Sequence, residues 1–498
     1  MPKKQFELVA AIDLGSNSFH MIVARIQDGQ LSIIDRIREM VRLADGIDKR
    51  GNIAPHAHKG ALECLQRFGE RLKELPRGAV RVVGTNTLRN AANAGSFLAQ
   101  AEKALGHSID IIAGVEEARL IYLGVAHSLA VNGQRRFVMD IGGSSTELII
   151  GDSYTPKHME SLEMGCVTTT QRYFADGVIT KQRIKQACLF ARIELEPHVR
   201  TYKNLGWEQA IGASGSIRSI KKVLVTSGLS NGTITLDNLH ALTNKIVETG
   251  SIDAQQLEGL NPERAPVFIG GLVILKATFE ALGIKEMEVS DRALREGLLH
   301  DLMGRFSDED VREKSISYLA QRYHADQDQS QRVATTARQL FDKVANKWSK
   351  DKEASEQWLK WAAQLYEIGL EIAHSRHHHH AAYIIEYSDL SGFSQQEQQL
   401  LAALVRSHRR KLPVKLYKEL PKRICKPVKR LAILLRLAVI LHRNRSNTPL
   451  PELALSVKEK TIRLGFPEGW LNNQPLTQAD LQQEVHYLSA IGFTLTIE

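Results

Sequence analysis

The feature that most constrains the fold of this chain is a short motif that occurs twice. Residues 13–18 are DLGSNS and residues 140–145 are DIGGSS, so each copy has an aspartate, an apolar residue and a glycine before further small residues. Each copy lies between two apolar, strand-like runs, as expected for the turn of a β-hairpin. Asp13 and Asp140 are 127 residues apart, and a repeat at this distance predicts a duplicated α/β domain with two facing hairpin loops.

The rest of the chain predicts four regions. Residues 1–124 and 125–306 alternate strand-like and helix-like runs, one region for each copy of the motif. Long helical patterns without strands follow over residues 307–445, and strand-like alternation returns over residues 446–498. The expected fold class is therefore α/β, with a helical domain and a small α+β domain after the duplicated part.

The charge of the chain is concentrated near its C-terminal end. The net charge is +9, but residues 406–445 hold 14 Lys and Arg and one acidic residue, so this segment carries +13 and the rest −4. Such a block predicts a polyanionic partner, such as nucleic acid, an anionic membrane or a phosphate polymer, unless it is only a solvated basic face. The four cysteines lie far apart without metal-site spacing, which favours a reducing compartment, the cytoplasm.

The two predicted loops suit phosphate binding. Backbone N–H groups of a Gly/Ser turn point into one concavity, which is how proteins hold phosphate oxygens. Two facing loops would hold a phosphate chain between them, and the carboxylates of Asp13 and Asp140 would bind Mg²⁺ beside it, directly or through water. Glu147 lies in the strand after the second loop, so it is either a further metal ligand or an ordinary solvent-facing residue.

Two more segments carry charged candidates whose role the spacing leaves open. Glu116 and Glu117 begin a predicted helix, where acids can stabilise the helix dipole or, alternatively, one of them can serve as the general base that activates water. Arg89 follows a strand in GTNTLR, and a guanidinium there can neutralise phosphate charge. A third Gly/Ser turn, IGASGSIRSI at residues 211–220, opens another helix.

Seven motifs together resemble the exopolyphosphatase/guanosine pentaphosphate phosphatase (Ppx/GppA) family of the actin-like ATPase-domain superfamily. They are AAIDLGSNSFHMIVARI, GTNTLRNAANA, IAGVEEARLIYLGVAHS, VMDIGGSSTELIIG, MGCVTTTQRYF, IGASGSI and VSDRALREGLL, and they span residues from about 8 to 306. The resemblance implies duplicated actin-like ATPase (ribonuclease-H-like) domains that flank a cleft. It also implies hydrolysis of a terminal phosphoanhydride with Mg²⁺ as cofactor.

The resemblance also implies roles for individual residues. Glu117 matches the catalytic glutamate that activates water, and Asp140 and Glu147 match acidic residues at the metal, to which we add Asp13. The expected phosphate-binding residues are Ser16, Asn17, Ser18, Arg89, Gly142, Gly143, Ser144 and Ser145.

The helical region resembles an HD-type phosphohydrolase domain, as in the long bacterial members of the family. Tyr366 and Glu367 stand where those members tend to have His-Glu, and tyrosine is a poor ligand for a divalent metal, so we expect no second catalytic centre. The histidine run at residues 377–380 could bind metal or, when protonated, phosphate. Arg292 stands where the family usually has glycine.

The family divides between two substrates, and the motifs are mixed. RLADGI, GTNTLR, GRFSDEDVR and LVRSHRRK favour the exopolyphosphatase branch, whereas RIREMVRLA favours the other. Because a basic track gains counterion release with each phosphate engaged, we expect an exopolyphosphatase that releases terminal orthophosphate processively from linear inorganic polyphosphate. The alternative is a guanosine-5'-triphosphate,3'-diphosphate (pppGpp) 5'-phosphohydrolase that makes ppGpp in the stringent response, or both activities together. A second alternative is a non-catalytic polyanion or membrane-surface binder.

The expected partners follow from these activities. They are inorganic polyphosphate or guanosine pentaphosphate and a second copy of the chain in a homodimer, and we expect no nucleic acid. The segment KRICKPVKRLAILLRLAVILHR is basic and apolar, which is typical of a peripheral contact with an anionic membrane. The expected location is cytoplasmic, with peripheral membrane association as a variant of it.

Overall fold

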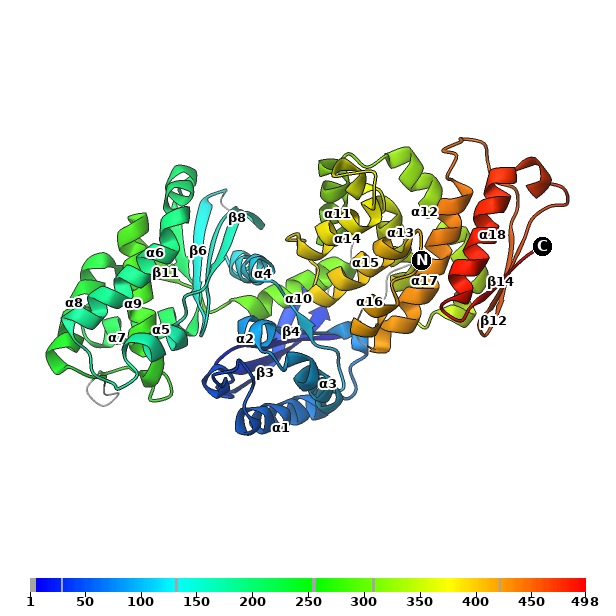
Figure 1. The fold of residues 1–498 in the computed structure, drawn as a ribbon. Helices are drawn as coiled ribbons and strands as arrows, with labels where there is room; N and C mark the ends of the chain where they lie inside the picture. The colour runs from blue at the N-terminus through cyan, green and yellow to red at the C-terminus, as the bar shows by residue number, and fades with distance from the viewer. Residues whose placement is uncertain (1–5, 28–29, 130–132, 253–256, 307–309, 421) are drawn as a thin grey trace. The chain divides into compact units, whose positions relative to one another are not determined.

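The computed structural model describes residues 6–27, 30–129, 133–252, 257–306, 310–420 and 422–498. The chain folds into two compact units, Met1–Asp310 and Val311–Glu498. Figure 1 shows the ribbon of both units.

The first unit begins with a five-stranded sheet in the order β3-β2-β1-β4-β5. Strands β1, β2 and β3 form an antiparallel meander, and β4 and β5 continue the sheet in parallel with β1. One face is covered by helices whose apolar sides join the strands in one core. The elements of this lobe are β1 (Leu8–Leu14), β2 (Phe19–Gln27), β3 (Gln30–Glu39), α1 (Pro55–Leu72), β4 (Val80–Gly84), α2 (Asn86–Asn90), α3 (Ala94–Leu105) and β5 (Asp110–Ile111).

A second, six-stranded sheet in the order β10-β11-β9-β6-β7-β8 repeats this plan. Strands β6, β7 and β8 form the antiparallel meander, and β9 and β11 run parallel to β6. The elements are β6 (Arg135–Ile141), β7 (Thr146–Asp152), β8 (Thr155–Leu162), α5 (Cys166–Tyr173), α6 (Lys181–Leu205), β9 (Gln209–Gly212), α7 (Gly215–Thr226), β10 (Ile234–Thr235), α8 (Leu236–Thr249), α9 (Ala265–Leu282) and β11 (Glu286–Val289). Each copy of the repeated motif thus occupies the turn of a hairpin, as the sequence predicts.

Helix α9 is the core helix of the second lobe. Among the described residues it is the one helix that is long and apolar enough to cross a membrane, and 72% of it is buried inside the protein. It packs against α5, α6, α7 and α8. Its apolar character is therefore explained by burial in this core.

Two helices, α4 and α10, join the lobes. Each of them follows a strand of one lobe, packs on the sheet of the other lobe and also packs on the other helix. Helix α4 (Gly114–Ala126) follows β5 of the first sheet but packs on β7 and β8 of the second. Helix α10 (Leu294–Phe306) follows β11 of the second sheet but packs on β1, β2 and β4 of the first. The two helices also cross each other closely: a Cβ on Gly297 would lie 1.8 Å from the carbonyl oxygen of Leu120. Only glycine permits this approach.

The turn before α10 does not require the glycine that the family usually has at residue 292. The backbone N–H of Arg292 donates to Ser290 Oγ at 3.0 Å, and that hydroxyl donates to the carbonyl oxygen of Arg292 at 3.0 Å. The side chain of Ser290 therefore closes the turn, and the backbone of Arg292 does not adopt the positive φ that would favour glycine.

The second unit is a bundle of helices that shares one core with a small sheet. Strands β12 and β13 are antiparallel, and β13 pairs with β14 in parallel, with α18 as the connection. One cluster of buried residues runs from Ile316 in the first helix to Leu495 in the last strand. The elements are α11 (Val311–Arg322), α12 (Gln327–Trp348), α13 (Lys352–Leu365), α14 (His377–Tyr387), α15 (Gln395–Ser407), α16 (Val414–Glu419), α17 (Lys422–Leu441), β12 (Ala454–Lys458), β13 (Thr461–Gly465), α18 (Pro475–Ser489) and β14 (Thr494–Ile497).

Part of the basic segment 406–445 is used inside this unit. Arg430 donates to the carbonyl oxygen of Trp348 at 3.0 Å, and other arginines form ion pairs with acids from outside the segment. These pairs are Arg436–Glu484, Arg443–Asp480, Arg445–Asp326 and Arg445–Glu367. The exposed basic surface is therefore smaller than the number of basic residues indicates.

The histidine run lies at the start of α14 and is partly internal. His377 and His378 are each 5% exposed, and their rings lie within 6 Å of the ring of buried His408 on the α15 side. Tyr366 is buried beside the same ring. Among the described residues, no group of three or more His, Cys, Asp or Glu has the arrangement of a metal site.

Candidate functional site

The two repeated loops line one pocket in the first unit. Asp13 lies near the end of β1 and Asp140 near the end of β6, where the strands of the two sheets give way to the hairpin turns. Crevices at the carboxyl ends of parallel strands are the common binding sites of α/β proteins. The lining includes the predicted residues Asp13, Ser16, Asn17, Ser18, Glu117, Asp140, Gly142, Gly143 and Ser145.

The two loops also touch each other. A Cβ on Gly143 would lie 2.9 Å from Cβ of Ser16, and the hydroxyls of Ser144 and Ser16 are 3.5 Å apart. The second loop is fixed from behind by α5, because the backbone N–H of Cys166 donates to the carbonyl oxygen of Gly142 at 2.9 Å. Any side chain on Gly143 would push the loops apart, so the sequence requires glycine here.

The third Gly/Ser turn completes the pocket. Ser214 caps α7 by accepting the backbone N–H of Ile217 at 3.1 Å, and Ser216 donates to the carbonyl oxygen of Ile141 at 3.2 Å. These bonds hold the third turn against the end of β6. Ser214, Gly215 and Ser216 all line the pocket, so the turn that the sequence left unassigned belongs to the site.

Four basic side chains of the pocket were not assigned by the sequence analysis, namely His20, Arg218, Arg264 and Arg295. Three of them are guanidinium groups, which suit phosphate oxygens. Arg218 lies in the third Gly/Ser turn, IGASGSIRSI, and could have been assigned together with it. Arg264 and Arg295 lie in segments without a Gly/Ser turn, so their signal was weak. His20, by contrast, stands directly opposite Asp13 in the β1–β2 register and could have been found from the hairpin alternation.

The carboxylates at the pocket are held in an unusual state. Burial is the main cause that raises the pKa of Asp13 to about 7, of Asp140 to about 6 and of Glu147 to about 7. It also raises the pKa of Glu117 well above its usual value, with the charge of Glu147 as the next cause. Carboxylates this close together and this poorly solvated favour a bound cation or a proton.

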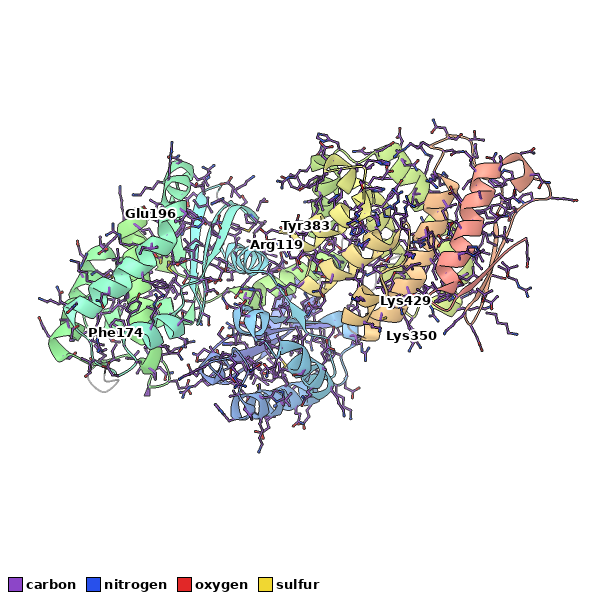
Figure 2. All side chains as sticks on the ribbon, in the orientation of Figure 1. Arg119, Phe174, Glu196, Lys350, Tyr383 and Lys429 are labelled. Carbon is purple, nitrogen blue, oxygen red and sulfur yellow. The ribbon has the colours of Figure 1, made fainter. Side chains whose placement is uncertain are left out.

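The two neighbouring glutamates of α4 have different surroundings in the structure. Glu116 accepts two hydrogen bonds from Arg119, at 2.7 and 2.8 Å, and Arg119 also pairs with Asp301 of α10 (Arg119 is labelled in Figure 2). Glu117 instead lines the pocket, and its Oε2 is buried without a hydrogen-bond partner. Glu116 therefore stabilises the helix crossing, whereas Glu117 is available for chemistry.

Three predicted residues lie beside the pocket rather than on its lining. The Oε1 of Glu147 accepts a hydrogen bond from Ser161 at 2.9 Å, and the charge of Glu147 raises the pKa of Glu117. Arg89 donates to the carbonyl oxygen of Ile112 at 2.6 Å, and its Nη1 lies 3.9 Å from Oε2 of Glu117. Ser144 is joined to the site through its contact with Ser16.

The residues present fit a magnesium ion held by few protein ligands. Asp13 Oδ1 and Glu117 Oε2 are buried without a hydrogen-bond partner, and such carboxylate oxygens can bind a cation. Among the described residues, however, no three acidic, histidine or cysteine side chains converge as a complete ligand cage. Mg²⁺ commonly keeps several waters and binds through one or two carboxylates together with substrate phosphates, so this arrangement is compatible with it.

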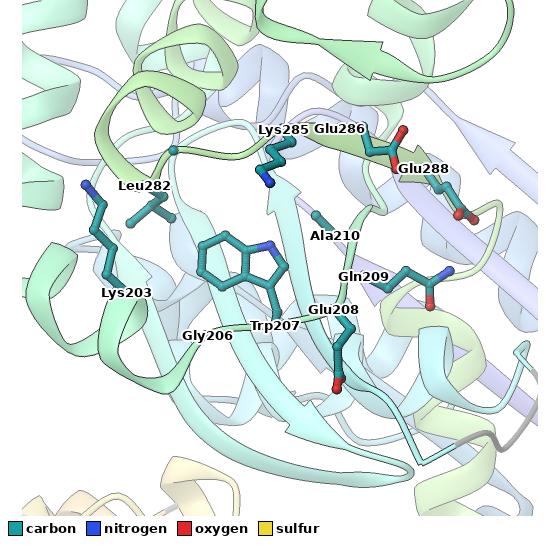
Figure 3. Close-up of a pocket in the computed structure, with 11 residues that line it drawn as sticks. Lys203, Gly206, Trp207, Glu208, Gln209, Ala210, Leu282, Lys285, Glu286 and Glu288 are labelled. Carbon is teal, nitrogen blue, oxygen red and sulfur yellow. The ribbon is translucent and has the colours of Figure 1, made fainter.

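A second pocket lies in the second lobe, away from every predicted site residue (Figure 3). It surrounds the indole of Trp207 at the amino-terminal ends of β9 and β11. The charged side chains around it, Lys203, Glu208, Lys285, Glu286 and Glu288, are exposed to solvent. Solvated charges of both signs do not select a ligand, so the candidate site is the pocket between the loops.

Comparison with known families matches most of the chain. Residues 22–306 match the model of the Ppx/GppA phosphatase family, and residues 311–485 match Ppx/GppA phosphatase, domain III. The first match begins within β2 and covers most of the first unit, and the second match covers most of the second unit.

Similar proteins extend over almost the whole chain. A protein of Aeromonas hydrophila is 40% identical over 486 residues, which are 98% of this chain and 98% of that protein. A protein of Vibrio cholerae is 40% identical over 495 residues, which are 99% of this chain and 98% of that protein. Both are named guanosine-5'-triphosphate,3'-diphosphate pyrophosphatase.

Solved structures resemble the first unit. The PPX-GPPA enzyme of Aquifex aeolicus is 26% identical, with a TM-score of 0.51, and covers 59% of this chain and 98% of its own. An exopolyphosphatase from Cytophaga hutchinsonii is 21% identical, with a TM-score of 0.54, and covers 60% of this chain and 97% of its own. At that identity the second likeness concerns the fold alone.

These comparisons correct the main expectation from the sequence. An exopolyphosphatase acting on linear polyphosphate is wrong as the principal activity, since the full-length relatives carry the name of the alternative substrate. The wrong expectation came from the basic segment 406–445, whose charge in the sequence predicts an open surface track for a long polyanion. In the structure, Arg436 of that segment is 1% exposed and is neutralised by a buried carboxylate.

Proposed function

This chain belongs to the Ppx/GppA phosphatase family. We propose that it hydrolyses the terminal anhydride of the 5'-triphosphate in guanosine-5'-triphosphate,3'-diphosphate. The chain is a phosphoanhydride hydrolase, as the motifs predict. The observation that carries the choice of substrate is the 40% identity, over at least 98% of both chains, to proteins named for this nucleotide. The products are orthophosphate and guanosine tetraphosphate.

Glu117 is the general base in this proposal. Its Oε2 is unpartnered at the pocket, and its raised pKa makes it a better proton acceptor than an ordinary glutamate. It takes a proton from water, whose oxygen forms a bond to the terminal phosphorus while the bond to the bridging oxygen breaks. Arg89, 3.9 Å from that carboxylate oxygen, keeps Glu117 turned toward the pocket.

The phosphates are held by backbone and guanidinium groups. The loops at residues 13–18 and 140–145 line one pocket, and N–H groups of such turns can hold phosphate oxygens without reorganisation. Arg218, Arg264 and Arg295 add positive charge on the same lining. Phosphoryl transfer depends mostly on positioning and charge neutralisation, which is what these groups supply.

Magnesium is proposed as the cofactor, held by Asp13 and Asp140 with Glu147 next to them. When bound, it would neutralise charge on the transferred phosphoryl group. The support is the unpartnered Asp13 Oδ1 and the raised pKa of each of these carboxyls. Before the ion binds, the charges of these three carboxylates add to the rise in the pKa of Glu117 that burial causes.

A phosphate-release assay tests the proposal. Purified protein is incubated with guanosine pentaphosphate and Mg²⁺, and the nucleotide product is identified by chromatography, with GTP and long-chain polyphosphate assayed in parallel. We expect tetraphosphate and orthophosphate in equal amounts, and faster release from the pentaphosphate than from polyphosphate. An intact pentaphosphate after a long incubation with folded protein would overturn the assignment.

Other expectations stay predictions of the sequence. They concern the HD-like character of the helical region, the homodimer, the cytoplasmic location with its peripheral membrane contact, and the region boundaries near residues 124 and 445.

A further inference from the structure

His20 lies behind Ser18 in the phosphate pocket and joins it to an arginine. The Nε2 of His20 is 2.8 Å from Oγ of Ser18, and its Nδ1 is 3.0 Å from Nη1 of Arg295. Ser18 is 7% exposed, and all three residues line the pocket. Arg295 reaches this position because α10, near whose start it lies, packs on β2, which carries His20.

The chemistry of these groups fixes the direction of both hydrogen bonds. A guanidinium can only donate, so Nδ1 of His20 must be the acceptor and carries no proton. A neutral ring then has its proton on Nε2, which donates to Oγ of Ser18. Burial, followed by the charge of Arg295, lowers the pKa of His20 to about 2, in keeping with a neutral ring.

We propose that His20 is a positioning residue that keeps the hydroxyl of Ser18 as a hydrogen-bond donor toward the substrate phosphate. The Oγ of Ser18 accepts the imidazole N–H with one lone pair, so its own hydroxyl proton cannot point at His20. Ser18 lines the pocket, and its hydroxyl can therefore donate into the pocket. Arg295 acts through His20 by selecting its tautomer. The inference rests on the proposed function only in naming the phosphate as the acceptor.

Ser16 on the same loop provides a comparison. Its Oγ is 2.8 Å from Oγ1 of Thr87 and 3.5 Å from Oγ of Ser144. Those partners are hydroxyls, which rotate and can donate or accept, so they do not fix the direction of the bond. Ser18 is different because its partner is held by an arginine that cannot accept.

The tautomer can be measured without substrate. Long-range ¹H–¹⁵N spectra of the full-length protein with labelled histidine give the protonation of each ring nitrogen, and His20→Gln identifies the signal of His20. We expect a neutral ring protonated on Nε2 at neutral pH. A ring protonated on Nδ1, or on both nitrogens, would overturn the proposal, whatever the substrate turns out to be.

A double-mutant cycle tests the route through Ser18. His20→Leu removes both hydrogen bonds, and we expect kcat on guanosine pentaphosphate to fall about 5- to 10-fold, the size of one hydrogen bond. In a Ser18→Ala background the same change should have almost no further effect, because its target is gone. Additive losses would show that His20 acts elsewhere.

His20→Gln supplies the rescue. The glutamine amide can accept from Arg295 with its oxygen and donate to Ser18 with its nitrogen, so most of kcat should return, whereas leucine offers neither group. If both variants lose activity equally while melting like the parent, the donor role is refuted. If the parent itself fails to cleave the pentaphosphate, the proposed function is lost, and the tautomer measurement still decides this inference.

Discussion

Buried charges are arranged differently in the two units. In the second unit, Arg436 and Glu484 are 1% and 2% exposed and pair through two hydrogen bonds of 2.5 and 2.6 Å. In the first unit, Asp13 and Glu117 each keep a buried carboxylate oxygen without a hydrogen-bond partner. A fold that only needs stability pairs such groups, because an unpaired buried charge is costly. Asp13 and Glu117 lack these hydrogen bonds and also line one pocket, which makes them candidates for chemistry rather than for stability.

The same difference occurs within one turn of helix α4. Glu116 is held by Arg119, which also pairs with Asp301. Glu117, the next residue, lines the pocket between the two loops. Two substitutions of equal chemistry at these positions should therefore have opposite effects on stability and activity.

Glu117→Gln should produce the largest change in rate. Since Glu117 is the proposed general base, we expect kcat on the proposed substrate, guanosine pentaphosphate, to fall by about 100- to 10,000-fold, a range typical of acid–base groups. The melting temperature should stay the same or rise, because a poorly solvated carboxyl becomes a neutral amide of similar shape. Phosphate release and thermal unfolding measure both quantities on one preparation.

Glu116→Gln is the matched control. It weakens a buried ion pair, so the melting temperature should fall while kcat stays near that of the parent. A rate for Glu117→Gln within a few-fold of the parent would remove Glu117 from the catalytic role. A large loss of rate in Glu116→Gln without unfolding would break the comparison between the two positions.

Arg436→Met should have the largest effect on stability. It leaves Glu484 buried without its partner, which costs about 3–5 kcal/mol of unfolding free energy. The double variant Arg436→Met with Glu484→Leu removes both charges and should recover most of that loss. Urea unfolding of the full-length protein measures the three differences, and a double variant as unstable as the single one would contradict the pairing argument.

The sequence predicts the part of the site that is local in the chain. The repeat of Asp13 and Asp140 places both hairpin loops, because strand, turn and strand are adjacent residues whose pattern is visible. The pocket also contains Arg218, Arg264 and Arg295, which come from separate elements and meet the loops only after both lobes fold. Arg218 follows the third Gly/Ser turn and is local to a visible motif. Arg264 and Arg295 have no such motif, so only long-range packing brings these two to the site.

The fold shows the same limit. The two sheets can be predicted from the alternation of apolar residues. The packing of α4 and α10 on each other's sheets cannot, because it depends on the close approach of Gly124 and Gly297 where the two helices cross. The prediction of a polyanion track along the basic segment 406–445 is wrong for a related reason. Its charge is local, but Glu484, which neutralises Arg436, comes from α18, beyond the segment.

Gly297→Ala should destabilise the first unit by about 1–3 kcal/mol, the usual size of overpacking. A Cβ at this position would lie 1.8 Å from the carbonyl oxygen of Leu120, so α4 and α10 must separate. Gly60→Ala in α1 is the control, because a Cβ there meets nothing within 4 Å. That variant should gain about 0.5–1 kcal/mol from the helix preference of alanine. Equal effects of the two variants in urea unfolding would show that the helix crossing is not tightly packed.

Acid should produce the smallest of these effects, through the buried histidines of the second unit. Burial, with the charge of neighbouring arginines, lowers the pKa of His377 to about 4 and of His378 to about 3. In the unfolded chain a histidine has a pKa of about 6.5, so between these values the unfolded state binds more protons and stability rises with pH. The contribution is complete above pH of about 6.5 and is lost as the pH falls, by about 1 kcal/mol for each ring near pH 5.5. Urea unfolding at several pH values measures the slope, which His378→Gln should reduce, and an ordinary pKa for both rings in an NMR titration would contradict their burial as neutral groups.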